Sequence, residues 1–188
     1  MDESCEKTRP NSEGTANKAS ARDALRAALV ALMLEKPFAR INVRELCNRA
    51  FVARSTFYAH YRNIDELLTE IEDAHVASLA ALNEPIADPH IASKDDMRFY
   101  AETLAYVQAH EPDFRALLST DPRSRFAAKW KEAVKRHLGA RRAAACEPPL
   151  SALALEVAAS AVVSAFAFYL ERPSAVKPDE AFSLIAKV

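Results

Sequence analysis

The chain has 188 residues, half of them apolar, which is enough for one large domain or two small ones with a shared core. It has only two glycines, Gly14 and Gly139, and because glycine supplies the positive φ angles of tight hairpin turns, this scarcity argues against a β-rich fold. The net charge of −1 gives, taken alone, no indication of a nucleic-acid partner. The abundant alanine and leucine favour helix, so the predicted fold class is all-α.

The elements are expected in the following order. Residues 1–19 are polar and without periodicity, which is typical of a disordered tail. A first helix is predicted over residues 20–36, because apolar side chains recur on one stripe and Pro37 stops the helix. That stripe contains Leu25, Leu29 and Leu32.

Two short helices follow. Asn42 is a good N-cap, with Glu45 three residues later as in a capping box, and it opens a helix over residues 43–50. After a turn at Phe51–Val52, a compact helix is predicted from residue 54 to about residue 61. Together with the first helix, these elements make a three-helix unit that can place its last helix in the DNA major groove.

The remainder of the chain is also predicted to be helical, which gives about nine helices in all. The further helices are expected over residues 63–82, 93–110, 112–118, 122–139, 150–171 and 177–188. Prolines at positions 85, 89, 148 and 149 mark the connections.

The charge distribution singles out the N-terminal unit. Residues 20–64 carry eight basic and three acidic side chains, a net charge of +5, whereas residues 65–188 carry 14 basic and 19 acidic ones, a net charge of −5. This asymmetry is expected when one lobe meets phosphate, the alternative being chance clustering of solvated surface charge.

The outward face of the helix at residues 54–61 suits a polyanion. Phe57 and Tyr61, spaced i and i+4, can anchor inward, and no acidic residue lies on this helix. Arginine can read guanine through two hydrogen bonds, and hydroxyl groups suit bases or phosphates. The side chains expected outward or at the flanks are Arg54, Ser55, Thr56, Tyr58 and His60.

The segment INVRELCNRAFVARSTFYAHYRNIDELL, from Ile41 to Leu68, resembles the DNA-binding domain of the TetR family of bacterial regulators. The apolar and capping pair at residues 41–42, the aromatic-rich stretch at residues 56–61 and the Glu-Leu-Leu at residues 66–68 carry the likeness, which covers about a quarter of the chain closely. The resemblance implies a helix-turn-helix domain over residues 20–65 and a helical effector-binding and dimerisation domain over residues 66–188.

The resemblance also implies roles for individual side chains. Arg54, Ser55 and Thr56 would face bases, and Tyr58 and His60 would contact the phosphate backbone or the groove edge. Asn42 and Arg44 would lie near a DNA phosphate, at the start of the second helix.

Three positions depart from the family pattern. Phe51 replaces the turn glycine, so the backbone there can differ, and Ala53 stands where a serine or threonine often caps the third helix, at a cost of about 1 kcal/mol. Ile64 occupies a position that is commonly a phosphate-binding lysine, for which Arg62 is a partial substitute.

The helix at residues 150–170 is apolar nearly all round and must therefore be buried in a core or in an oligomer interface. With the segment from residue 177 to the end, it is predicted to form a four-helix dimer interface. The interface residues expected on it are Leu153, Val157, Ala161, Ala165 and Phe168.

The middle helices are expected to hold an effector pocket, although aromatic residues at helical spacing also suit a plain core. The candidate contacts are Met97, Tyr100, Leu104, Phe114, Trp130 and Phe166. No phosphate loop, paired carboxylates or nucleophile elbow is found, so neither an enzyme nor a cofactor is expected. The histidines have no ligand spacing, so no metal site is expected.

These features predict a TetR-like regulator, a repressor that binds palindromic double-stranded operator DNA as a homodimer and is released by a small-molecule effector. A cytoplasmic location is expected, since the first residues are polar and no apolar run is expected to reach membrane-spanning length. The alternative, motivated by residues 51, 53 and 64, is a related helical protein with weak or no DNA binding that acts through protein partners.

Overall fold

The computed structural model describes residues 12–82, 92–118, 124–142 and 150–172, and within these ranges it contains helices and no strand, which confirms the all-α prediction. The eight α-helices are α1 (Ser12–Glu35), α2 (Val43–Ala50), α3 (Arg54–His60), α4 (Ile64–Leu82), α5 (Ala92–Ala109), α6 (Glu111–Leu117), α7 (Phe126–Arg142) and α8 (Leu150–Glu171). A short 3₁₀ helix, Phe38–Arg40, joins α1 to α2. The helix predicted at residues 177–188 lies outside the described residues.

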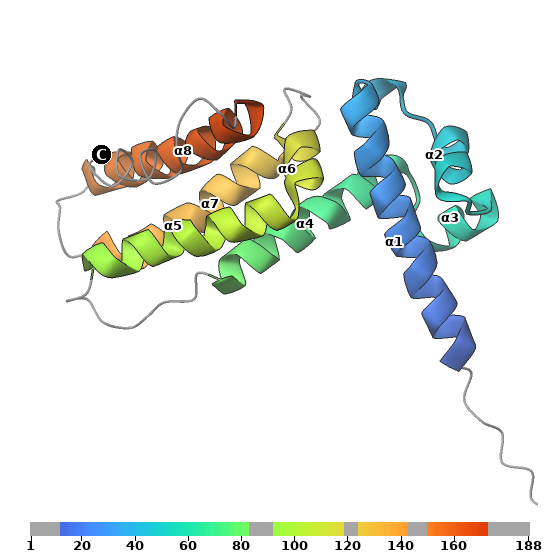
Figure 1. Ribbon diagram of the computed structural model, residues 1–188, viewed down its shortest axis with the longest axis horizontal. Coiled ribbons are helices and arrows are strands. Elements are labelled where there is room, and N and C mark those ends of the chain that lie inside the picture. Colours follow the sequence, from blue (N-terminus) through green and yellow to red (C-terminus); the bar gives the residue numbers. More distant parts are fainter. Residues whose placement is uncertain (1–11, 83–91, 119–123, 143–149, 173–188) are drawn as a thin grey trace, which may run out of the picture.

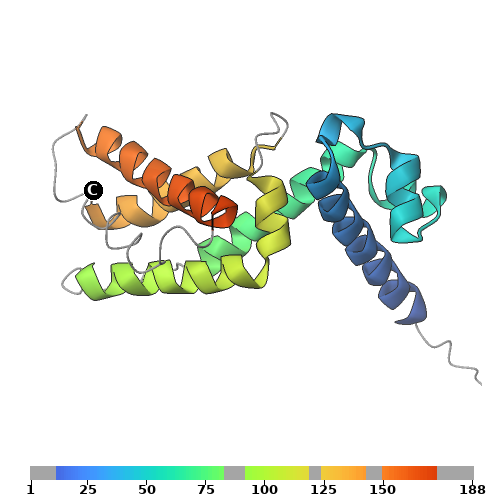
Figure 2. The same ribbon diagram turned by 45° about the horizontal axis from the view of Figure 1, so that its top comes forward.

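The helices form two groups along the long axis of the molecule (Figure 1). At one end, α1, α2 and α3 pack together, and at the other end α5, α7 and α8 are grouped, with α8 packed against α7. Helix α4 runs from the first group into the second, where it packs against α5 and α7. The turned view in Figure 2 shows the same division, with α6 lying on the side of the second group that faces α1.

Helix α1 begins at Ser12, earlier than the start predicted near residue 20. Its second half is fixed by Leu25, Leu29 and Leu32, all of which are buried. Once such a segment is anchored, extending the helix by one residue costs far less free energy than nucleating a new helix. Polarity and missing periodicity in the sequence therefore did not prevent residues 12–19 from continuing the helix.

Two buried polar side chains tie α4 to its neighbours. Glu72 is only 2% exposed; its carboxylate pairs with Lys129 Nζ at 2.9 Å and accepts a hydrogen bond from the backbone N–H of Arg125 at 2.8 Å. His75, also buried, lies 3.0 Å from Tyr106 Oη through Nδ1 and 3.0 Å from Asp113 Oδ2 through Nε2. These contacts join α4 to α5, α6 and α7.

The histidines are closer together than their sequence spacing indicated. The ring centroids of His75 and His110 are 5.4 Å apart, because α5 and α6 bring residue 110 back onto α4. Within the described ranges no three potential ligand residues lie close enough to hold a metal ion.

Candidate nucleic-acid interface

Helix α3 is held by its two aromatic anchors. Phe57 and Tyr61 are buried, and their ring centroids are 5.7 Å apart. Phe57 lies within α3 and Tyr61 is its C-cap residue, with extended backbone, and α3 packs against α1 and α2. The predicted inward orientation of both residues is confirmed.

A hydrogen-bond network that the sequence did not reveal fixes the end of α3. Tyr61 Oη donates to Glu70 Oε1 at 3.1 Å and accepts from Arg22 Nε at 3.3 Å, while Arg22 Nη2 lies 2.6 Å from Glu70 Oε2. Burial raises the pKa of the Tyr61 hydroxyl, and the hydrogen bond to Tyr61 is the main cause of a raised pKa at Arg22. The network joins the end of α3 to both α1 and α4.

The start of α2 is capped as predicted. Asn42 Oδ1 accepts a hydrogen bond from the backbone N–H of Glu45 at 3.0 Å. The Glu45 carboxylate pairs with Lys36 Nζ at the end of α1. Asn42 therefore supplies the N-cap, while Glu45 connects α2 to α1.

The turn between α2 and α3 contains an unusual backbone conformation. Phe51 has φ 54° and ψ 37°, the left-handed region that glycine adopts most easily. The phenylalanine is therefore forced into the conformation a turn glycine would supply. Its side chain is 96% exposed, so the ring gains almost no burial in return.

We expect Phe51→Gly to raise the free energy of unfolding by about 0.5–1 kcal/mol, because relief of about 1–2 kcal/mol of left-handed strain exceeds the entropy that glycine adds to the unfolded chain. Urea unfolding followed by circular dichroism measures the change. Phe51→Ala keeps the β-carbon and is expected to leave stability within about 0.5 kcal/mol of the parent. Equal free energies of unfolding for Phe51→Gly and Phe51→Ala would contradict backbone strain at residue 51.

The other two departures from the family pattern also have structural consequences. Ala53 is the N-cap of α3 and offers no side-chain hydrogen bond. Ile64 is buried at the start of α4 and does not face solvent, so it has no means of contacting phosphate. Arg62, two residues earlier, is exposed, and its backbone N–H donates to Glu66 Oε2 at 2.7 Å.

The side chains predicted to contact DNA are accessible and lie on α2, α3 or the residues beside them. Thr56 and His60 are half-buried, and Tyr58 is 51% exposed. The others are exposed: Asn42, Arg44, Arg54, Ser55 and Arg62.

Because some basic side chains of residues 20–64 form ion pairs, the positive charge that stays unpaired lies mainly near α2 and α3. Three of the basic side chains of residues 20–64 are neutralised: Arg22 pairs with Glu70, Lys36 with Glu45 and Arg49 with Glu35. Among residues 20–64, the exposed arginines that form no ion pair with a described residue are Arg40, Arg44, Arg54 and Arg62, and the half-buried Arg26 on α1 also forms none. Most of the unpaired positive charge of residues 20–64 therefore lies on guanidinium groups on and beside α2 and α3.

Helix α8 has one buried and one exposed apolar face. Ala159, Val162 and Phe166 are buried, and α8 packs mainly against α7. The predicted interface residues are exposed or half-buried: Leu153 is 60% exposed, Val157 46% and Phe168 41%, with Ala161 and Ala165 half-buried.

The expectation that no apolar run is long enough to span a membrane was wrong. The segment Ala152–Glu171 is long and apolar enough by length and composition alone, and a third of it is buried. This is weak evidence for a membrane, because a bundle helix passes the same test. The carboxylate of Glu156 pairs with Lys131 Nζ at 2.5 Å and with Lys135 Nζ at 3.1 Å, which ties α8 to α7.

The aromatic residues proposed as effector contacts pack against one another. Trp130 lies 5.5 Å from Phe114 and 5.2 Å from Phe166 between ring centroids, and all three are buried. Tyr100 is buried, Leu104 is partly buried, and the side chain of Met97 lies outside the described part of the chain. These contacts are those of a core, and ligand contact by these residues stays a prediction.

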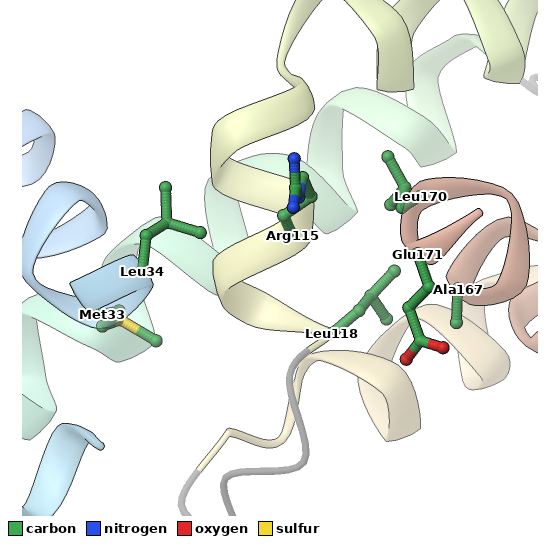
Figure 3. Close-up of a pocket in the computed structure, with 7 residues that line it drawn as sticks. All are labelled: Met33, Leu34, Arg115, Leu118, Ala167, Leu170 and Glu171. Carbon is green, nitrogen blue, oxygen red and sulfur yellow. The ribbon is translucent and has the colours of Figure 1, made fainter. Parts of the chain in front are cut away.

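A cavity of about 320 Å³ lies elsewhere, between α1, the end of α6 and the end of α8 (Figure 3). None of the five proposed effector contacts whose side chains are described lines it. Its walls are formed by Met33, Leu34, Arg115, Leu118, Ala167, Leu170 and Glu171.

An anchored α3, a short α2 joined to it by a tight turn, and accessible arginines beside both define a helix-turn-helix in an all-helical protein. Residues 25–71 match the family described as "Bacterial regulatory proteins, tetR family", which confirms the resemblance inferred from the sequence. The chain therefore carries a TetR-family helix-turn-helix domain.

Solved structures of transcription regulators are similar to this chain over most of its length. A TetR transcriptional regulator from Streptococcus agalactiae has a TM-score of 0.71 at 17% identity, covering 93% of this chain and 96% of that one. NalD of Pseudomonas aeruginosa, the secondary repressor of the MexAB-OprM multidrug efflux pump, has a TM-score of 0.59 at 18% identity, covering 90% and 94%. The dihydroxyacetone kinase operon activator DhaS has a TM-score of 0.59 at 16% identity, covering 89% and 92%.

Proposed function

We propose that this protein is a transcription regulator, and not an enzyme, that binds operator DNA by placing α3 in the major groove. The observation that carries the proposal is the set of unpaired, exposed guanidinium groups beside a helix whose opposite face is anchored by Phe57 and Tyr61. Arginine hydrogen-bonds guanine edges and phosphates, and a fixed helix presents it in one register.

The proposed roles follow from position. Arg54, Ser55 and Thr56 lie in the first turn of α3 and are assigned to base edges. Tyr58 and His60 are assigned to the backbone or the groove edge. Phosphate contacts near the start of α2 and after α3 are assigned to Asn42, Arg44 and Arg62.

The salt dependence of binding tests this proposal. Fragments selected from genomic DNA would be titrated at 50 and 200 mM salt, and affinity should fall by about a thousandfold, as expected for a dimer with six or more phosphate contacts. An absence of duplex binding at 50 mM salt would favour the second candidate, a helical protein that acts through protein partners. The buried Ile64, in place of a phosphate-binding side chain, is the observation that favours that candidate.

We further propose that the active form is a homodimer built on α8. Its exposed apolar face is continuous with a buried core, and a second copy of the same face would cover it. Dimerisation would supply two reading helices for the two halves of a palindrome, about 34–36 Å apart or a multiple of that distance.

Replacing both Leu153 and Val157 by glutamate is expected to weaken the dimer by roughly a thousandfold, because the interface would have to bury unpaired charges. Light scattering at micromolar concentration should then show monomers. Ala101→Glu with Ala105→Glu, two exposed positions on α5, is the matched control and should remain dimeric. A parent chain that is already monomeric would contradict the proposed interface.

The proposal also covers regulation. The protein acts in the bacterial cytoplasm as a repressor, and it is released from its operator when a small molecule binds the helical domain. A ligand shifts such a protein only through its different affinities for two conformations. The hydroxyl of Thr103 supports a site in this domain, because it is fully buried and has no hydrogen-bond partner among the described residues. Repression, as opposed to activation, is proposed on the example of NalD. DhaS, which has the same TM-score, is an activator.

A further inference from the structure

The cavity in Figure 3 lies where the two groups of helices meet. Met33 and Leu34 belong to the last turn of α1, and α1 packs directly on α2 and α3. The opposite wall comes from the ends of α6 and α8. A volume of about 320 Å³ is at the lower end of the range of small-molecule sites. A molecule in this cavity would therefore contact both groups of helices at once.

The walls combine an apolar middle with two groups of opposite charge. Leu34, Leu118 and Leu170 provide apolar surface, and Leu34 is an exposed large hydrophobic residue. Figure 3 shows the charged ends of Arg115 and Glu171 well separated, with the Leu118 side chain between them in the view.

Neither charged group has a strong partner. The guanidinium of Arg115 lies 3.5 Å from the Glu111 carboxylate, an exposed pair one turn away that contributes little. Glu171 forms no ion pair with any residue in the described ranges, and it sits in the last turn of α8, where unpaired carbonyl groups add negative potential. The cavity can therefore accept an anion at Arg115 and a cation at Glu171.

We propose that this cavity binds a small amphipathic zwitterion, with its carboxylate at Arg115, its ammonium group at Glu171 and its apolar body across Leu118. Because Met33 and Leu34 of α1 also line this cavity, a ligand held between α6 and α8 lies against α1 and favours one placement of the helix-turn-helix relative to the rest of the molecule. The effect on DNA rests on the proposed function, whereas binding of the ligand does not.

The probe is 8-aminooctanoate, titrated by calorimetry into the full chain without DNA, with octanoate and octylamine as single-charge controls. The zwitterion is expected to bind at least tenfold more tightly than either control. Arg115→Met should remove its advantage over octylamine, and Glu171→Gln its advantage over octanoate. Equal affinity for all three molecules, or no response to either substitution, would overturn the proposal.

Arg98→Met removes an exposed arginine on α5, away from the cavity, and should leave the affinity unchanged; an equal loss in this control would overturn the assignment to Arg115. Operator binding is measured separately. Saturating 8-aminooctanoate should change the operator Kd of the parent at least fivefold and leave that of Arg115→Met unchanged. An unchanged parent Kd overturns the coupling, whereas a chain that binds the zwitterion but no duplex overturns the proposed function and leaves the site standing.

Discussion

Phe57→Ala is expected to lower the free energy of unfolding by about 4 kcal/mol and to abolish specific DNA binding. Phe57 is completely buried, and its ring contacts the ring of Tyr61 at a centroid distance of 5.7 Å. Its removal opens a cavity between α3 and the helices beneath it. The reading helix would then lose its fixed register as well as its packing. Chemical denaturation and duplex titration measure the two effects.

The neighbouring Tyr58 is the matched control. Its ring lies 5.3 Å from that of Phe57, edge to face, but it is half exposed. Tyr58→Ala should cost less than about 1 kcal/mol of stability, because little burial and one edge-to-face contact are lost, while still weakening DNA binding. If the two substitutions destabilised the chain equally, Phe57 would not be the anchor of α3.

Glu72→Ala is expected to lower the free energy of unfolding by about 3 kcal/mol. The substitution removes the carboxylate that pairs with Lys129 and accepts the backbone N–H of Arg125, and it leaves that donor without its partner. The value falls at the lower end of the range for buried pairs, because Lys129 keeps some access to solvent and retains Asp73 at 2.7 Å. Thermal unfolding followed by circular dichroism checks it.

Asp73→Ala provides the comparison within the same cluster. Asp73 pairs with the same ammonium group but is exposed, so its loss should cost no more than about 0.5 kcal/mol. If Asp73→Ala lowered the free energy of unfolding strongly and Glu72→Ala only slightly, burial would not determine how much each carboxylate of this cluster stabilises the fold.

Local signals in the sequence predicted the helix-turn-helix well. The N-cap hydrogen bond at Asn42 joins residues only three positions apart, and Phe57 and Tyr61, four positions apart, are both buried at and beside α3. The bounds of α8 follow from a largely apolar stretch that begins after two prolines and ends at charged residues. Each of these features depends on residues that are neighbours in the chain.

The contacts that position the site depend on residues far apart in the chain. Arg22 reaches Glu70 from 48 positions away, and His75 meets Asp113 across 38 positions. No spacing rule relates such pairs, because the packing of α1, α4 and α6 brings them together. The cavity beside Arg115 was missed for the same reason, since three distant helices form its walls.

The measurement that decides most directly whether α3 reads DNA is the affinity of Arg54→Ala for a selected duplex at fixed salt. Arg54 is exposed in the first turn of α3 and forms no ion pair with a described residue, so its removal should not change thermal stability. Arg98→Ala serves as the control for losing one exposed positive charge. We expect a loss of affinity of about tenfold or more per half-site for the selected duplex and little change for random duplex. Unchanged affinity for the selected duplex, with Arg54→Ala and Arg98→Ala indistinguishable, would contradict a base-reading role for α3.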